Sequence, residues 1–164
     1  MLPPSSASSS TSSAAPLTGS PEAQVVSQAQ LKRERLRFVD FHFTRTQSGQ
    51  CTAEVELEWI DNVRVSGTAS GQSSPMGDLR IAAEAGLRAL ETFTEGQLQL
   101  ELIGIKAMRA FDANIVIVSV GVLKGDGPRK LLGCYLAERD PIRASVVAVL
   151  NATNRLLGNF IATR

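Results

Sequence analysis

The sequence has few of the residues that usually hold metals or perform catalysis. Among 164 residues it contains one histidine, His42, and two widely separated cysteines, Cys51 and Cys134. Metal sites need clustered ligands, and an activated nucleophile needs a neighbouring base. Neither a Gly-x-Ser-x-Gly elbow nor a phosphate-binding Walker sequence occurs. The sequence therefore gives no positive indication of an enzyme, a metal site or a cofactor, and we expect His42 to be an ordinary strand residue.

Excess charge and long apolar runs are also missing. The formal net charge is +1, and no apolar run approaches the roughly 20 residues that span a bilayer. The N-terminus lacks the basic and apolar regions of a signal peptide, so we expect a cytoplasmic protein, away from membranes, with reduced, buried thiols. A short basic cluster, Lys32, Arg33 and Arg35, has few interleaved aromatic residues, which makes nucleic-acid binding the weakest of the functions considered.

The beginning of the chain differs in composition from the rest. Serine, threonine, proline and alanine dominate up to about residue 24, and Glu22 is the only charged side chain there. Such a segment buries too little apolar surface to offset its ordering entropy. We predict a disordered Ser/Pro-rich tail over residues 1–30 and a single domain over residues 31–164.

The first half of the domain, about residues 36–95, predicts three strands and a helix. Residues 36–44 form a strand with a possible bulge, and residues 52–59 alternate apolar and acidic side chains, which is typical of a half-buried antiparallel strand. Its solvated face would carry Glu54, Glu56 and Glu58. A third strand follows over residues 63–69, and a helix begins at Pro75 or Asp78 and runs to Phe93.

The second half, about residues 98–160, repeats this order. Strands are predicted over residues 98–108, 112–123 and 129–138, and Asp140 caps a helix whose first residue is Pro141. Four pairs of identical residues lie 66 positions apart in the sequence: Gly67 and Gly133, Pro75 and Pro141, Ala82 and Ala148, and Leu90 and Leu156. We therefore predict an α+β fold of two tandem β-β-β-α repeats with pseudo-twofold symmetry, in which helices cover antiparallel sheets.

Several short runs resemble the C-terminal allosteric, dimerisation domain of 2-isopropylmalate synthase and of related citramalate synthases. The resemblance covers about residues 36–160. It is carried by Asp112-Ala113 at a turn, by the helix entry Asp140-Pro141-Ile142-Arg143-Ala144-Ser145, and by Leu150-Asn151-Ala152-Thr153-Asn154-Arg155 near the helix end. The resemblance implies a regulatory domain that binds an amino acid and dimerises. The catalytic barrel of that family is absent from this sequence.

One segment departs from the family pattern. The family's short entry to the first helix is replaced by a longer run, Gly71 to Asp78. In the family this region helps to form the effector pocket, so the change puts an amino-acid site there in doubt. The ligand-binding candidates that the resemblance and the helix entries together suggest are Gly71, Ser73, Ser74, Asp78, Asp112, Ala113 and Asp140.

Physical chemistry leaves two interpretations of the helix entries open. Unpaired backbone N–H groups in a first turn favour a carboxylate or another anion. Alternatively, Ser74, Asp78 and Asp140 satisfy these donors themselves as capping residues, and this second interpretation is slightly favoured. Asp112 is most simply a turn residue.

The last helix presents a flank of small and amide side chains. Such a surface suits a semi-polar contact with the other repeat or with another subunit. We predict that it forms an interface through Ala144, Val147, Ala148, Asn151 and Asn154, and that the protein is a homodimer. The leading function is then a non-catalytic module that senses an amino acid or another small carboxylate. The alternative is a protein-interaction or assembly scaffold whose pocket is filled by side chains.

Overall fold

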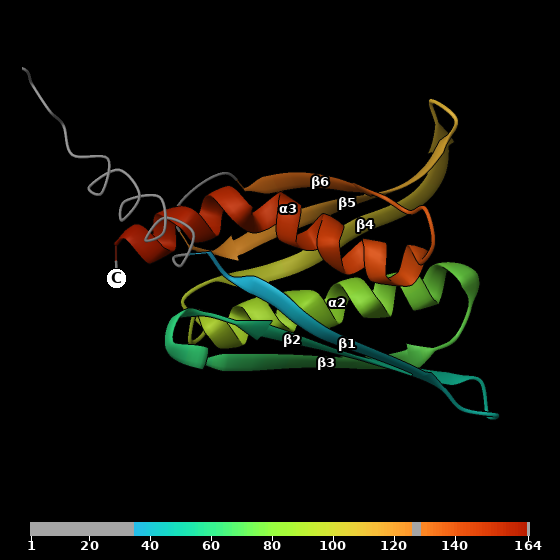
Figure 1. Ribbon diagram of the computed structural model, residues 1–164, viewed down its shortest axis with the longest axis horizontal. Coiled ribbons are helices and arrows are strands. Elements are labelled where there is room, and N and C mark those ends of the chain that lie inside the picture. The colour runs from blue at the N-terminus through green and yellow to red at the C-terminus, as the bar shows by residue number, and fades with distance from the viewer. Residues whose placement is uncertain (1–34, 126–128, 164) are drawn as a thin grey trace, which may run out of the picture. The chain divides into compact units, whose positions relative to one another are not determined.

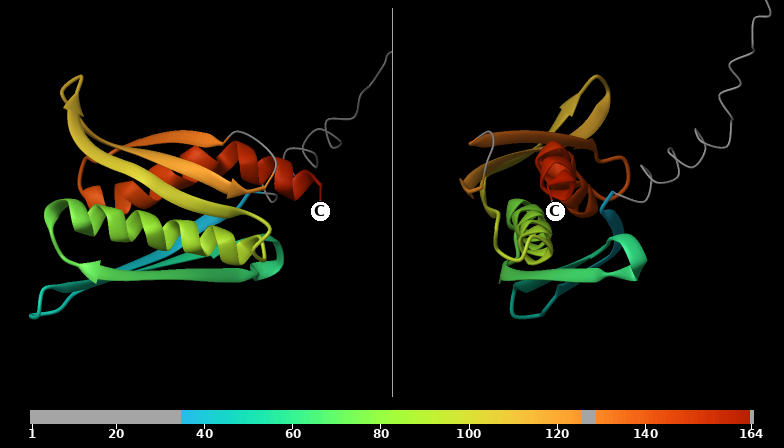
Figure 2. Two further views of the ribbon diagram at one scale, coloured as in Figure 1. Left: turned by 180° about the vertical axis from the view of Figure 1, so that it is seen from behind. Right: turned by 90° about the vertical axis from the view of Figure 1, so that its left-hand side faces the viewer.

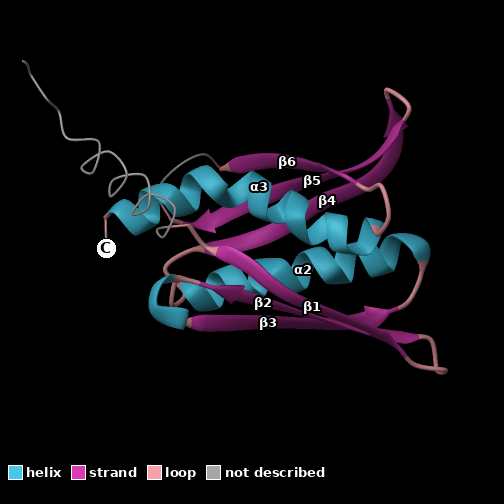
Figure 3. Ribbon diagram, in the orientation of Figure 1, coloured by secondary structure: helices cyan, strands magenta, loops and turns pink. Residues whose placement is uncertain are grey.

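The computed structural model describes residues 35–125 and 129–163, which form two consecutive β-β-β-α units. The first contains β1 (Arg37–Arg45), β2 (Gln50–Glu58), the 3-10 turn η1 (Ile60–Asn62), β3 (Arg64–Gln72) and α2 (Pro75–Phe93). The second contains β4 (Gln99–Ala110), β5 (Ala113–Lys124), β6 (Lys130–Leu136) and α3 (Pro141–Ala162). The predicted α+β fold with two β-β-β-α repeats is confirmed (Figures 1 and 3). The predicted tail, residues 1–30, lies outside the described residues.

Each unit has its own antiparallel sheet, in which every strand pairs with its neighbour along the chain. Sheet A has the order β1-β2-β3 and sheet B the order β4-β5-β6. The central row of sheet A aligns Phe41, Val55 and Gly67. The matching row of sheet B aligns Ile105, Val118 and Gly133. The bulge predicted in the first strand is present between Phe38 and Asp40.

The two helices lie between the two sheets, as Figure 2 shows. Helix α2 packs on β2 and β3 and also contacts β4, whereas α3 packs on β5 and β6, and the helices contact each other. Both helices begin at the end of the molecule where the β1–β2 and β4–β5 turns lie (Figure 1). The core between the layers is aliphatic: Val55, Leu57, Leu90, Val118, Val120 and Val149 are fully buried. The rings of Phe93 in α2 and Phe160 in α3 pack edge to face near the ends of the two helices, with their centroids 6.3 Å apart.

Glycine allows each helix to approach its sheet closely. A Cβ on Gly67 would lie 2.1 Å from the backbone nitrogen of Ala89, and one on Gly133 would lie 2.1 Å from the backbone oxygen of Ala148. Gly67 also faces Ala85, and Gly133 also faces Ala152. Ala148 is therefore the counterpart of Ala85 and not of Ala82, so the helix alignment predicted from the sequence is wrong by about one turn, although the pairing of the two glycines is consistent with the register.

The outer faces of the two sheets differ in polarity. On sheet A, Glu54 points outward and Arg64 forms ion pairs with Glu56 at 3.0 Å and with Glu58 at 3.5 Å. The predicted acidic face of the second strand is therefore the outer, solvated face. On sheet B, the exposed side chains include large apolar ones: Ile103, Met108, Leu132 and Leu136.

Candidate functional site

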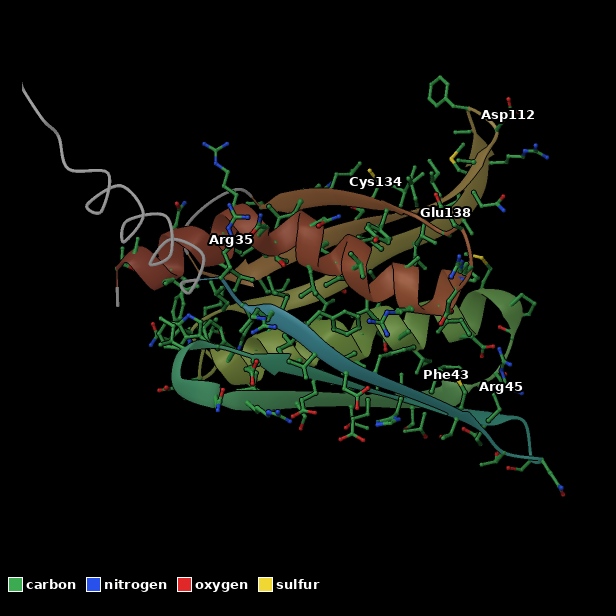
Figure 4. All side chains as sticks on the ribbon, viewed as in Figure 1. Arg35, Phe43, Arg45, Asp112, Cys134 and Glu138 are labelled. Atoms are coloured by element: carbon green, nitrogen blue, oxygen red, sulfur yellow. The ribbon has the colours of Figure 1, made fainter. Side chains whose placement is uncertain are left out.

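The first turn of α2 contains an ion pair between Asp78 and Arg45 of β1. The Ser74 side chain caps the helix by accepting a hydrogen bond from the backbone N–H of Gly77 at 2.9 Å. Asp78, in the first turn, is buried with 4% of its surface exposed. Its carboxylate accepts hydrogen bonds from Arg45 Nε at 3.0 Å, from Arg45 Nη2 at 2.6 Å and from the Ser73 hydroxyl at 2.8 Å. Figure 4 shows Arg45 at this end of the molecule.

These contacts favour the ionised form of the Asp78 carboxyl group. Burial acts to raise the pKa of Asp78, but hydrogen bonds from Arg45, Ser73 and Cys51 outweigh it and hold that pKa below its usual value. Burial and the nearby Asp78 carboxylate raise the pKa of the Cys51 thiol. Ser74 thus caps α2 as the capping interpretation predicts, whereas the Asp78 carboxylate is bound by the side chains of Arg45 and Ser73 and not by backbone N–H groups of the first turn.

Gly71 has a packing role at the same place. A Cβ at this position would lie 2.7 Å from Cδ1 of Ile81 in α2. The absence of a side chain therefore makes room for an aliphatic side chain of the helix. The four candidates near the start of α2, namely Gly71, Ser73, Ser74 and Asp78, lie close together. Their contacts cap the helix and pack it against the sheet.

Asp112 lies at the tip of the β4–β5 hairpin (Figure 4), and Ala113 is the first residue of β5. Phe111 and Asp112 both have positive φ, 51° and 60°, as a tight turn requires. The Asp112 carboxylate lies 3.6 Å from Arg109 and its side chain is 99% exposed. Asp112 is therefore a turn residue, and Ala113 pairs with Ala110 across the hairpin.

The entry to α3 borders a cleft. Asp140 caps the helix by accepting hydrogen bonds from the backbone N–H groups of Ile142 and Arg143, at 2.9 and 3.1 Å. Beside it a cleft of about 460 Å³ opens between β1, β6 and α3. Its lining combines aromatic, aliphatic and charged side chains: Phe38, Tyr135, Leu136, Glu138, Arg139, Asp140, Arg143, Ala144 and Val147. We call this the α3 cleft.

Two arginines, Arg139 and Arg143, line the α3 cleft together with two carboxylates, Glu138 and Asp140. The guanidinium carbon of Arg143 lies 4.7 Å from the centre of the Phe38 ring, a cation–π contact that holds the side chain at the cleft. Arg139 forms no ion pair with any residue that the structure describes. Together with Glu138, Arg139 also borders a second cleft of about 420 Å³ on the side of the β4–β5 hairpin.

The predicted interface flank of α3 is divided between the interior and the surface. Ala144 and Ala148 are only 1% and 0% exposed, and Ala148 packs against Gly133 of the chain's own β6. They therefore cannot form a contact with another subunit, and this part of the prediction is wrong. Val147 is half-buried and lines the α3 cleft. Asn151 and Asn154 are exposed, and the Asn151 amide donates a hydrogen bond to the carbonyl of Cys134 at 3.1 Å.

Sequence reasoning missed most of the residues that line the α3 cleft. Phe38 belongs to the first strand, and the fold brings it beside Arg143 from the last helix. Of the lining residues, the sequence predicts Asp140 as a ligand candidate and Ala144 and Val147 as interface candidates, because all three lie in or near the first turns of the last helix. Arg45 was missed in the same way, since it reaches Asp78 from the far end of another strand.

The remaining chemical candidates are His42 and the two cysteines. His42 faces solvent, and its Nε2 lies 3.0 Å from a carboxylate oxygen of Asp40. Cys51 is buried as predicted, but Cys134 is exposed on the outer face of sheet B, so the prediction of two buried thiols is wrong for Cys134. Within residues 35–125 and 129–163, no cluster of histidine, cysteine and acidic side chains could hold a metal ion.

Comparison of the sequence with known family models and with curated proteins finds no match to either. None of the helices in the described ranges is long and apolar enough to cross a membrane.

Proposed function

We propose that the protein is a non-catalytic regulatory module of the cytoplasm that senses a small carboxylate, with an amino acid as the leading class of ligand. The observation that carries this proposal is the α3 cleft, in which two arginines lie beside aromatic and aliphatic side chains. The resemblance to the allosteric domain of 2-isopropylmalate synthase supports a regulatory role for the same fold.

The lining residues suggest how such a ligand binds. Guanidinium groups bind carboxylates with two parallel hydrogen bonds, and Arg139 is uncommitted among the described residues. Phe38 and Val147 offer apolar surface to a ligand side chain, and the Glu138 carboxylate offers a partner for an ammonium group. Asp140 already occupies backbone donors of the first turn. The proposed carboxylate contact is therefore with the arginines and not with the helix N-terminus.

The test is a thermal-shift screen of the full chain against amino acids and small organic acids, followed by calorimetric titration of any compound that binds. A specific ligand at 100 times its dissociation constant raises the free energy of unfolding by about 2.7 kcal/mol. We expect Arg139→Gln to weaken binding at least tenfold. The matched control is Arg155→Gln, an exposed arginine of α3 outside the α3 cleft, which is expected to leave binding unchanged.

The proposal fails if no compound shifts the unfolding temperature, or if Arg139→Gln binds as tightly as the wild type. The first outcome favours the alternative function, an assembly scaffold without a ligand pocket. A specific observation supports that alternative: at the α2 entry, the Arg45 side chain occupies the position beside Asp78 that a ligand cation would need.

A further inference from the structure

Equivalent positions on the outer faces of the two sheets carry different chemistry. The registers of sheets A and B align Ser66, Thr68 and Ser70 of β3 with Leu132, Cys134 and Leu136 of β6. The same alignment places Glu54 of β2 at the position of Ile117 of β5. Hydroxyl and carboxylate side chains in the first repeat thus correspond to apolar side chains and a thiol in the second.

The apolar outer face of sheet B is large and accessible. It is formed by six side chains, of which Leu132 is 74% exposed and Leu136 49% exposed: Ile103, Met108, Ile115, Ile117, Leu132 and Leu136. From the strand rise and spacing, three strands over about eight residues cover roughly 370 Å² in plan. The largest apolar patch on a typical monomeric protein covers about 300–600 Å² and is often functional. Ser119, Cys134 and Lys106 lie among these apolar side chains, and the long stem of Lys106 at the edge strand β4 can reach solvent.

The polar row at one end of this face indicates the partner. Glu101 of β4 and Lys130 of β6 flank Gly121 of the central strand, so one edge of the row is acidic and the other basic. The Ile103 side chain packs over Gly121: a Cβ added to Gly121 would lie 3.2 Å from Cδ1 of Ile103. A surface with an acid on one edge and a base on the opposite edge is complementary to a second copy of itself.

We propose that the outer face of sheet B binds a second copy of this chain, with a twofold axis running along β5. In this arrangement β4 of one protomer lies over β6 of its partner. Glu101 then faces the partner's Lys130, and Ile103 and Met108 face the partner's Leu132 and the partner's Leu136. Packed antiparallel sheets keep their strands within about 30° of each other, so the long charged side chains can still meet at the ends.

The other twofold orientation is unfavourable. An axis across the strands would place the Glu101–Lys130 row opposite the apolar Met108–Leu136 row of the partner. Both charges would then lose water without gaining an opposite charge, which is costly. The α3 cleft opens on the helix side of sheet B and shares only Leu136 with the outer face, so substitutions at Leu132, Glu101 and Lys130 test this inference separately from the proposed ligand.

The first test is molar mass by sedimentation velocity, over a range up to tens of micromolar, with the full chain. We expect the wild type to form a dimer and Leu132→Glu to be a monomer, because a carboxylate would be buried against the partner's apolar face. The matched control, Ser66→Glu at the equivalent position of sheet A, is expected to remain dimeric. Denaturant melts at low concentration check that both variants fold. A monomeric wild type, or a dimeric Leu132→Glu, overturns the proposal.

The second test distinguishes the orientation. Glu101→Lys places lysine on both edges of the row, and we expect it to weaken dimerisation at least tenfold, with partial recovery in high salt. The double variant Glu101→Lys with Lys130→Glu restores an acid and a base on opposite edges, and we expect it to restore the dimer. Dimerisation that does not respond to Glu101→Lys, or a double variant as weak as the single one, overturns the proposed axis.

Discussion

Two glycines at equivalent strand positions determine how close each helix lies to its sheet. Gly67 and Gly133 each face helix backbone at a distance that no side chain can occupy. The helix residues opposite them are alanines, so the contact is between backbones and has no flexible side chain that could move aside. A single methyl group at either position must therefore displace a whole helix.

We accordingly predict that Gly133→Ala is severely destabilising. Overpacking of a core ordinarily costs about 1–3 kcal/mol, and here the obstacle is rigid, so we expect about 3 kcal/mol or more. Denaturant melts measure this loss directly. The control is Gly158→Ala in α3, where a Cβ would meet nothing within 4 Å. Because alanine is the better helix former, that variant should gain about 0.5–1 kcal/mol. Similar effects at the two positions would contradict this account.

The Asp78–Arg45 pair makes stability depend on pH in a defined direction. The pKa of Asp78 is lower in the folded protein than in the unfolded chain, where it is about 3.9. The folded state therefore binds this proton less readily, and the carboxylate contributes stability that is fully present above about pH 5. The contribution is lost as the pH falls through the depressed folded pKa.

The corresponding prediction concerns Asp78→Asn. At neutral pH we expect it to cost roughly 1.5–3 kcal/mol, the usual range for hydrogen bonds to a charged group. The difference between wild type and variant should shrink steadily below about pH 4, as measured by urea melts at a series of pH values. A difference that stays constant from pH 7 to pH 3 would mean that Asp78 does not titrate as the ion pair requires.

Among the elements, α3 begins at a well-defined cap. The Asp140 side chain accepts hydrogen bonds from two backbone N–H groups, and Pro141 occupies the first helical position. We predict that Asp140→Ala lowers the free energy of unfolding by about 0.5–2 kcal/mol, whereas Asp140→Asn, which keeps a capping oxygen, costs much less. If alanine and asparagine at this position have equal effects in thermal melts, the cap does not stabilise the helix.

The strands and helices were largely predictable from the sequence because their signals are local. Alternation in β2, the Asp-Pro start of α3 and the Ser-Pro start of α2 all act over a few neighbouring residues. The α3 cleft was not predictable, since it depends on Phe38 reaching Arg143 across the whole chain. The apolar alternation of residues 52–59 predicts that Trp59 is buried; it packs edge-on against Phe93, with ring centroids 5.4 Å apart, but it is only half-buried.

At the scale of the whole molecule, the exposed apolar face of sheet B could not be inferred from β5 alone. Its outward residues Ile115 and Ile117 alternate with the buried residues Val116 and Val118. A run of this kind usually indicates a strand buried on both sides. Which side is left open depends on where the helices pack, and the sequence does not encode that locally.

The N-terminal segment gives a further prediction at this scale. Residues 1–30 are rich in serine and proline and lack apolar periodicity. We expect a chain that starts at residue 31 to keep its free energy of unfolding within about 0.5 kcal/mol of the full chain. Limited proteolysis should yield a resistant fragment that begins between about residues 25 and 36. A fragment that unfolds once the segment is removed would contradict this prediction.

The pairing of every strand with its chain neighbour has a consequence for how the molecule folds. Each sheet closes only short loops, so neither repeat needs the other to form its hydrogen-bonded ladder. The start of the first repeat lies near the end of α3, because Arg35 and Ile161 border one groove. The start of the second repeat lies near the same end of α3, because Leu98 and Phe160 border another groove. A circular permutant that starts at Gln97 and joins α3 to β1 through a short glycine linker should therefore keep the same fold. Its contact order would hardly change, and its refolding rate should stay within a few-fold of the wild type.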